Sequence, residues 1–262
     1  MILDKLAASA RVRVERLKAE RPLESVREEA LSIKPEKPFC FEKALKKEDI
    51  AFICEVKKAS PSKGLIAPDF PYVHIARDYE AAGADAISVL TEPQYFLGSD
   101  DYLSAVKRAV SIPVIRKDFT IDPYQIYEAR IIGADAVLLI CALLDTKALT
   151  EYIRIADRLG LTALVEAHDA AEVASALEAG ARVIGVNNRN LKTFEVDIEN
   201  SARLRQLVPE HITFVSESGI KTPGDIDALR KNGTDAVLIG ETLMRSSRKA
   251  EELARLRGER LA

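Results

Sequence analysis

The chain has 262 residues, of which 47% are hydrophobic and 30% charged, and its formal net charge is −3. This composition can supply a large core, and because the length exceeds that of most single domains, we expect either one barrel or two small domains. The basic residues are spread through helical stretches and form no concentrated patch, which argues against a nucleic-acid partner.

Three cysteines, Cys40, Cys54 and Cys141, lie in apolar surroundings without the spacing of disulfides or of a zinc site. They are typical of buried thiols in a reducing compartment, so we expect a cytoplasmic protein. No apolar run approaches the length of a membrane span, and the amino terminus lacks the layout of a secretion signal. The histidines are scattered and no His, Asp and Glu set has metal-ligand spacing, so we expect no metal and no cofactor.

Residues 2 to about 31 carry apolar side chains at helical spacing, with Arg, Lys and Glu between them. The apolar stripe consists of Leu3, Leu6, Ala10, Val14 and Leu17. Pro22 separates this helix from a second, shorter one. We expect residues 1–48 to be a helical extension that docks on a barrel of residues 49–262 within one domain, and a coiled-coil partner is the alternative.

From Ile50 onward, short β-rich runs alternate with amphipathic helices, and a repeated phrase marks the alternation. The phrase occurs at residues 83–86 (GADA), 133–136 (GADA), 180–183 (GARV) and 233–236 (GTDA). Each glycine follows a helical stretch, where a left-handed C-cap favours a residue without Cβ, and each phrase opens an apolar strand. The spacing between phrases is roughly that of two strand–helix units, so a further strand is expected in each interval.

The expected strands are residues 53–57, 86–90, 114–117, 136–140, 163–166, 183–187, 213–216 and 236–239. Because each is followed by a helix and no linker divides them, they predict an α/β fold, a closed (β/α)8 TIM barrel with an added N-terminal helical segment. An open doubly wound sheet is the alternative. Against it, the phrases are evenly distributed and no GxGxxG fingerprint follows the first strand.

The first strand ends in a carboxylate and an ammonium two residues apart, Glu55 and Lys57, before a loop rich in Ser, Pro and Gly. Residues i and i+2 of a strand point to the same face, so these two side chains are expected to project together. An edge strand with solvated charges is the alternative. In a barrel, however, polar residues at the carboxyl ends of the strands line the active site, which favours a functional pair.

The same rule gathers polar residues from the other strand ends at one mouth. They are Thr91 and Glu92, Lys117 and Asp118, Glu166, Asn187 with Asn188 and Arg189, Glu217 and Ser218, and Gly240 with Glu241. Each alone could be a capped strand end or a solvated loop. Together they would repel one another and lose hydration, which favours a function for the cluster.

The loops after the seventh and eighth strands contain Gly219 and Gly240, each shortly before a helix, and Glu241 follows the second glycine. Such loops in barrels frequently hold a phosphate on backbone N–H groups and a helix N-terminus. The sequence therefore predicts a phosphate site at these residues. Two glycines that serve only tight turns are the alternative.

Six separated motifs, in the right order, resemble the indole-3-glycerol phosphate synthase family. They are residues 55–64 (EVKKASPSKG), 90–92 (LTE) with 95–98 (YFLG), 116–119 (RKDF), 164–168 (LVEAH), 185–191 (GVNNRNL) and 216–220 (SESGI). The resemblance implies a carbon–carbon lyase of tryptophan biosynthesis. Its reaction would close the ring of 1-(2-carboxyphenylamino)-1-deoxyribulose 5-phosphate, with loss of carbon dioxide and water, to give indole-3-glycerol phosphate.

The polar residues suit this chemistry. Attack of an aryl carbon on a ketone needs a cationic acid at the carbonyl oxygen, which Lys117 can supply. Family analogy makes Glu166 the base of the final dehydration, with Lys57 assisting at the oxygen and Glu55 holding Lys57 in place. Which lysine serves which step stays open, and we expect burial and the neighbouring lysine to lower the pKa of Lys117.

Further polar residues are expected to bind substrate. Asn187 and Ser218 would position hydroxyls or the carboxylate, and Glu217 would orient a lysine. Arg189 would bind either the substrate carboxylate or its phosphate. The loop that contains Ser60 is a second candidate for the anion.

Apolar contacts to the anilino ring are expected from Pro61, Phe96 and Phe119, with the N-terminal helix as a lid. For Phe119, an ordinary core position is the alternative. His168 follows Glu166 by two residues and would share its face of the strand, and we expect it to have a hydrogen-bonded supporting role and not a catalytic one. We also expect a monomer or weak homo-oligomer, and contact with other tryptophan-pathway enzymes stays open.

Two other functions remain at this point. A sugar-phosphate isomerase or epimerase would share the phosphate loops but should not need two lysines and Glu55 at one mouth. A binding or scaffold protein on the same fold would have no reason to keep Lys57, Lys117 and Glu166 together.

Overall fold

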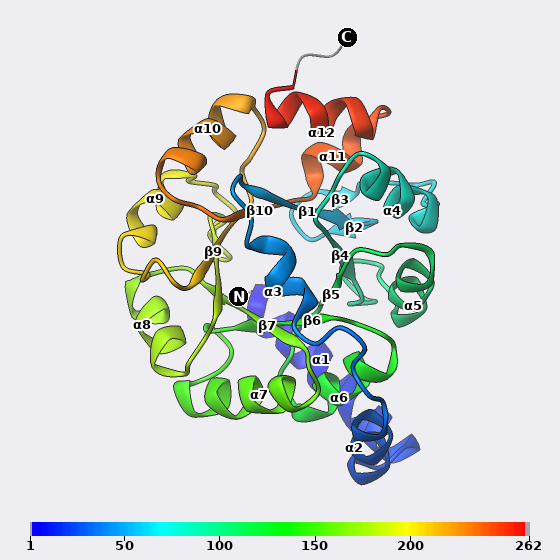
Figure 1. Cartoon of the computed structure of the whole chain (residues 1–262). Helices are drawn as coiled ribbons and strands as arrows, with labels where there is room; N and C mark the ends of the chain where they lie inside the picture. Colours follow the sequence, from blue (N-terminus) through cyan, green and yellow to red (C-terminus); the bar gives the residue numbers. More distant parts are fainter. Residues whose placement is uncertain (1, 260–262) are drawn as a thin grey trace.

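Eight parallel strands form a closed barrel in the computed structural model, which describes residues 2–259 (Figure 1). The strands are β1 (Ala51–Val56), β4 (Ala86–Leu90), β5 (Val114–Lys117), β6 (Ala136–Ile140), β7 (Thr162–Ala167), β8 (Val183–Asn187), β9 (Thr213–Glu217) and β10 (Ala236–Ile239). Each pairs with the next, and β10 closes the ring against β1. The predicted barrel is confirmed, while Met1 and residues 260–262 of the predicted domain lie outside the described range.

Helices cover the outside of the barrel (Figure 1). They are α4 (Tyr72–Ala81), α5 (Asp100–Ala109), α6 (Pro123–Ile131), α7 (Thr146–Arg158), α8 (Ala170–Glu178), α9 (Glu199–Arg205), α10 (Pro223–Lys231), α11 (Glu241–Arg245) and α12 (Lys249–Arg257). Five of them begin at a residue whose side-chain oxygen accepts a first-turn N–H: Ser99, Asp122, Asp145, Asp169 and Thr222. Within residues 2–259, no helix is long and apolar enough to cross a membrane.

The repeated phrase has a second role, at the N-terminal end of the barrel. Its glycines cap helices with φ between 80° and 91°, as the sequence predicted. Its aspartates cap neighbouring strands, because Asp85 accepts the backbone N–H of Phe52 at 2.8 Å and Asp235 accepts that of Phe214 at 2.7 Å. Asp135 does the same for the start of β5. Where the phrase contains an aspartate, it therefore ties the helix end to the adjacent strand, whereas the third copy has Arg182 at this position.

A short helix that the sequence analysis missed, α3 (Cys40–Leu45), closes the same end of the barrel. Its side chains Phe41 and Leu45 are fully buried and pack with inward-facing strand residues such as Ile53 and Ile115. In Figure 1, α3 lies in front of the centre of the ring. It is only six residues long, so the helical period leaves little signal in the sequence.

The N-terminal helices α1 (Ile2–Glu20) and α2 (Leu23–Ser32) dock on the barrel as predicted. In Figure 1, α1 lies behind the ring, at the opposite end from α3. The bond from Arg13 Nη2 to Asp118 Oδ1 is 2.7 Å long, and Lys18 Nζ lies 2.6 Å from Asp122 Oδ2. Both carboxylates follow β5, so α1 is fixed across the mouth of the barrel.

The loop after β1 contains a second feature that the sequence did not predict. Ala59–Ser60 (β2) and Gly64–Leu65 (β3) form a small antiparallel hairpin. The first strand itself runs over Ala51–Val56 and not over residues 53–57, so Lys57 lies just beyond its end. The hairpin holds the Ser/Pro loop in a defined shape beside the mouth.

Candidate active site

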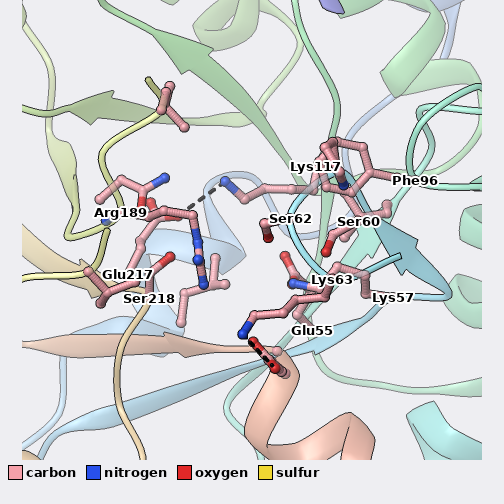
Figure 2. Close-up of a pocket in the computed structure, with 18 of the residues that line it drawn as sticks. Glu55, Lys57, Ser60, Ser62, Lys63, Phe96, Lys117, Arg189, Glu217 and Ser218 are labelled. Carbon is pink, nitrogen blue, oxygen red and sulfur yellow. Dashed lines mark hydrogen bonds and ion pairs between the residues drawn. The ribbon is translucent and has the colours of Figure 1, made fainter. Parts of the chain in front are cut away.

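A cavity of about 490 Å³ lies at the carboxyl ends of the strands. Every residue that the sequence predicted to act on or bind substrate lines it: Glu55, Lys57, Ser60, Pro61, Phe96, Lys117, Phe119, Glu166, Asn187, Arg189, Glu217, Ser218, Gly219, Gly240 and Glu241. Figure 2 shows charged side chains from opposite sides of the barrel converging on one space. The individual roles of these residues stay predictions.

Three strand-end residues that we grouped with the mouth do not reach the cavity. Thr91 donates its hydroxyl to Asp118 at 2.7 Å, and Glu92 accepts the backbone N–H groups of residues 94–96. The Asn188 amide donates to the Ser216 hydroxyl at 3.1 Å. These three buried side chains are hydrogen-bonded, so they stabilise the loops around the site.

Lys117 lies at the centre of the mouth, between two carboxylates. Its Nζ is 2.9 Å from Glu166 Oε2 and 3.1 Å from Glu217 Oε2. Burial alone would lower the pKa of this ammonium, but the carboxylates of Glu166, Glu217 and Glu55 together raise it above its ordinary value. The expected lowering of the Lys117 pKa is therefore wrong, because its nearest partners are acids and not the other lysine.

The two carboxylates around Lys117 differ in their pKa values. Burial raises the pKa of Glu217 to about 7, since the attraction of Lys117 is opposed by Glu166 and Glu55. Burial also acts on Glu166, but Lys117, His168 and Asn187 outweigh it and lower that pKa. Two neighbouring carboxylates with divergent pKa values are typical of acid–base sites.

A glycine that the sequence analysis overlooked makes room for this arrangement. Gly185 lies inside β8, and a Cβ at this position would overlap the Glu217 carboxylate. A glycine in the middle of a strand often marks such a close approach, and this was the available signal.

Glu55 and Lys57 form the expected ion pair, Lys57 Nζ donating to Glu55 Oε1. The pair packs directly against Gly240, where a Cβ would overlap Glu55 Oε1 and lie 2.8 Å from Lys57 Nζ. The φ of Gly240 is −116°, a value open to any residue, so glycine is needed here for space. We had assigned this glycine to phosphate binding, and the structure gives it a second, steric reason.

The predicted phosphate loops have suitable backbone and charge. Ser218 and Gly219 both have positive φ, 67° and 87°, in the turn that follows β9. The Glu241 carboxylate pairs with Arg245 Nε at 3.0 Å and with Lys63 Nζ at 3.5 Å. Those two cations and Lys221 also line the cavity, and the sequence analysis had not assigned Lys221 or Arg245.

The opposite wall of the cavity is apolar. The rings of Phe96 and Phe119 lie with their centroids 5.9 Å apart at 39°, and Ile2, Leu3 and Leu6 of α1 complete the wall. Phe119 thus faces the cavity, although it also packs on the inner core. This surface can accommodate an aromatic ring.

No group of three or more His, Cys, Asp or Glu side chains within residues 2–259 is arranged to hold a metal ion. The polar side chains that face the cavity are cations, carboxylates, one amide and hydroxyls. Such a set can donate and accept protons and can bind anions.

Solved structures share this architecture. The 3-hexulose-6-phosphate synthase from Salmonella typhimurium has a TM-score of 0.65 at 16% identity, covering 79% of this chain and 96% of that one. The thiamine phosphate pyrophosphorylase from Pyrococcus furiosus has a TM-score of 0.60 at 16% identity, covering 80% of this chain and 94% of that one. At this identity the likeness shows the fold alone.

Sequence comparison is more specific. A family model described as Indole-3-glycerol phosphate synthase matches residues 3–256. The indole-3-glycerol phosphate synthase of Ruminiclostridium cellulolyticum is 69% identical over 258 residues, which cover 98% of this chain and 99% of that protein. That of Endomicrobium trichonymphae is 58% identical over 257 residues, which cover 98% and 100%. The chain belongs to the indole-3-glycerol phosphate synthase family.

Proposed function

We propose that the cavity closes the indole ring through Lys117 and Glu166, with Lys57 assisting at the leaving oxygen. The family's activity is formation of indole-3-glycerol phosphate in tryptophan biosynthesis, a carboxy-lyase reaction on a phosphorylated small molecule. The observation that carries these roles is the position of the Lys117 ammonium between two buried carboxylates, Glu166 and Glu217. Family membership removes the isomerase and scaffold alternatives.

In the first step, the aryl carbon attacks the ketone and negative charge develops on the carbonyl oxygen. The raised pKa of Lys117 keeps its ammonium charged near neutral pH, so it can donate to that oxygen. The attack leaves an iminium on the ring. When carbon dioxide leaves, the electrons of the broken carbon–carbon bond move to this iminium and restore the aromatic ring. Decarboxylation therefore needs no proton transfer from the protein.

The second part is a dehydration, which needs a base and an acid. The lowered pKa of Glu166 keeps this carboxylate ionised, so it can take a proton from the ring intermediate. Lys57, held by Glu55, donates a proton to the hydroxyl, which leaves as water. One proton is taken and one is given in this step, so it balances.

The substrate's anionic groups are proposed to bind on opposite sides of the reacting centre. The backbone of Gly219 and Gly240 holds the phosphate, with Lys63 and Arg245 nearby. Since these groups already serve the phosphate, Arg189 is assigned to the carboxylate, whose two oxygens suit a guanidinium. The other polar side chains of the mouth, Asn187, Ser218 and Ser60, would hold the hydroxyls of the sugar chain.

The N-terminal segment is proposed to act with the barrel as one domain, residues 1–48 with 49–262. Two observations support this: α1 supplies part of the cavity wall, and Arg13 ties it to Asp118. The anilino ring would pack between this wall and the pair Phe96 and Phe119, with Pro61 at its edge.

The chain is further proposed to work in the cytoplasm as a monomer or weak homo-oligomer, in reach of other tryptophan-pathway enzymes. All three cysteines are free thiols, as a reducing compartment favours, and burial raises the pKa of Cys141 to about 12. The large exposed apolar side chains come from separate elements, which favours a chain without an extensive apolar interface.

The test is formation of the fluorescent indole product from 1-(2-carboxyphenylamino)-1-deoxyribulose 5-phosphate. Glu166→Gln should lower kcat by at least about a hundredfold, the usual cost of losing a positioned base, with a smaller change in substrate affinity. Glu210→Gln, at an exposed carboxylate far from the cavity, is the matched control and should leave kcat unchanged. If Glu166→Gln kept kcat within a few-fold of the parent, Glu166 would not be the base.

A further inference from the structure

Behind Glu166 lies a histidine that does not line the cavity. The Nε2 atom of His168 is 3.4 Å from Glu166 Oε1, on the carboxylate oxygen that Lys117 does not contact. This nitrogen is buried and has no hydrogen-bond partner among the described residues. An imidazole nitrogen left without a partner next to a carboxylate is placed for charge interaction with it.

The ring of His168 is held from its other side. Nδ1 lies 3.0 Å from Glu172 Oε2, and the same oxygen accepts the backbone N–H of His168 at 2.7 Å. Glu172 stands in the first turn of α8, where its own N–H is bonded to the N-cap Asp169. Asn200 of α9 donates to the His168 carbonyl at 3.1 Å, so α8 and α9 both hold the residue.

The charged groups around this ring are mostly acidic. Glu166 faces it from β7, Glu172 from α8 and Glu217 from β9, while Cys141, after β6, donates its thiol to the Glu172 carbonyl. Lys117 reaches only the far oxygen of Glu166. Burial alone would lower the pKa of His168, but Glu172 and Glu166 outweigh it and raise that pKa. The surrounding carboxylates therefore favour the imidazolium over the neutral ring.

We propose that His168, charged and held by Glu172, is a positioning residue that keeps Glu166 ionised and aimed at the substrate. His168 Nε2 lies beside Oε1 of Glu166, and the Asn187 amide donates to the same oxygen at 3.3 Å. Oε2 is therefore the oxygen turned to Lys117 and the reacting atoms. The His168 ring does not touch the substrate in this arrangement. The inference rests on the proposed role of Glu166 as the base.

Two variants separate the effect of the positive charge of His168 from the effect of its position beside Glu166. His168→Asn keeps a hydrogen-bond donor near Glu166 but removes the positive charge. Glu172→Gln keeps an acceptor for the His168 backbone and ring but removes the charge that favours the imidazolium. His211→Asn is the matched control, because His211 is exposed and has no contact with the mouth.

The first readout is the titration of Glu166 followed by ¹³C NMR of labelled glutamate carboxyls, with the signal assigned from Glu166→Gln. In His168→Asn the Glu166 midpoint should move upward by roughly 1 to 3 pH units, the usual effect of losing a neighbouring opposite charge. Glu172→Gln should move it in the same direction by less. This titration needs no turnover, so it tests the effect of His168 on the ionisation of Glu166 even if Glu166 proves not to be the base.

The second readout is the pH profile of kcat. The acid limb of His168→Asn should shift upward with the Glu166 midpoint, while kcat at the plateau stays within roughly tenfold of the parent, less than the loss of the base itself. A folded His168→Asn protein whose Glu166 midpoint and acid limb match those of the parent would overturn the proposal. An active Glu166→Gln enzyme would instead overturn the assignment of the base and leave the titration result standing.

Discussion

The two ends of the barrel use acidic side chains in opposite ways. At the N-terminal end, Asp85 and Asp135 each accept a strand N–H and also pair with a lysine, Lys47 at 2.9 Å and Lys107 at 2.5 Å. At the mouth, Glu217 has a buried oxygen, Oε1, that is without a hydrogen-bond partner in the described part of the chain.

This difference assigns stability to the N-terminal end of the barrel and activity to the mouth. The N-terminal end is closed by α3 and its carboxylates are satisfied, so it can hold the strands together. The mouth keeps Glu55, Glu166 and Glu217 around one ammonium, Lys117, beside an open cavity. Like charges in a buried space lower stability unless a function requires them. Substitutions at the two ends should therefore differ in which property they change.

Among substitutions that leave the reacting side chains themselves unchanged, the largest effect is expected from Gly240→Ala. The added Cβ would displace the Glu55–Lys57 pair, and a displacement of about 1 Å in an active site can cost up to about a hundredfold in kcat. Gly224→Ala is the matched control, because its Cβ would meet only Thr222 Oγ1 at an ordinary 3.6 Å. Equal kcat values for the two folded variants would show that the pair tolerates displacement.

The next effect concerns stability at the mouth. Folding raises the pKa of Glu217 from 4.5 to about 7, so its contribution to stability is fully present below 4.5 and is lost as pH rises through 7. Glu217→Gln stays neutral and should become more stable than the parent above pH 7, by on the order of 3 kcal/mol at about 1.4 kcal/mol per pKa unit.

Urea unfolding of Glu217→Gln and the parent at pH 5 and pH 8 measures this gain. Glu210→Gln, at an exposed carboxylate, controls for the general effect of removing a charge. A stability difference that did not grow between the two pH values would mean that Glu217 is already ionised at pH 5.

The smallest effect is expected at the N-terminal end. Asp235→Ala leaves the buried N–H of Phe214 without its acceptor, which should lower the free energy of unfolding by about 1 to 3 kcal/mol. The kcat of the folded variant should remain that of the parent, since Asp235 lies at the other end of β10 from the mouth. A large loss of kcat without a loss of stability would contradict the separation of the two ends.

Much of this architecture follows from sequence pattern, because strand–helix alternation and the glycine caps are local signals. The polar residues that end the strands could be placed at one mouth because the barrel brings all strand ends together. Their partners could not be placed, since Thr91 bonds to Asp118 of the next βα loop and Glu92 bonds within its own loop only once these loops have folded. The direction of the Lys117 pKa also needed the structure, because it depends on which of several charges lies nearest.

Short elements and contacts between strands also could not be predicted from the sequence. The helix α3 is too short for periodicity, and the role of Gly185 depends on a carboxylate from the neighbouring strand. Lys221 and Arg245 had no motif to mark them, since single basic residues in loops and helix ends are usually solvated.

The central claim is that Lys117, paired with Glu166 and Glu217 at the mouth, performs the chemistry. The ion pair of Lys107 with Asp135 at the other end only supports the fold. The most direct test measures kcat and the free energy of unfolding for Lys117→Met and Lys107→Met together. Lys117→Met should lose at least about a hundredfold in kcat, and Lys107→Met should keep kcat within a few-fold while losing some stability. Parent-like turnover in a folded Lys117→Met protein, or an equal loss in both variants, would contradict the account.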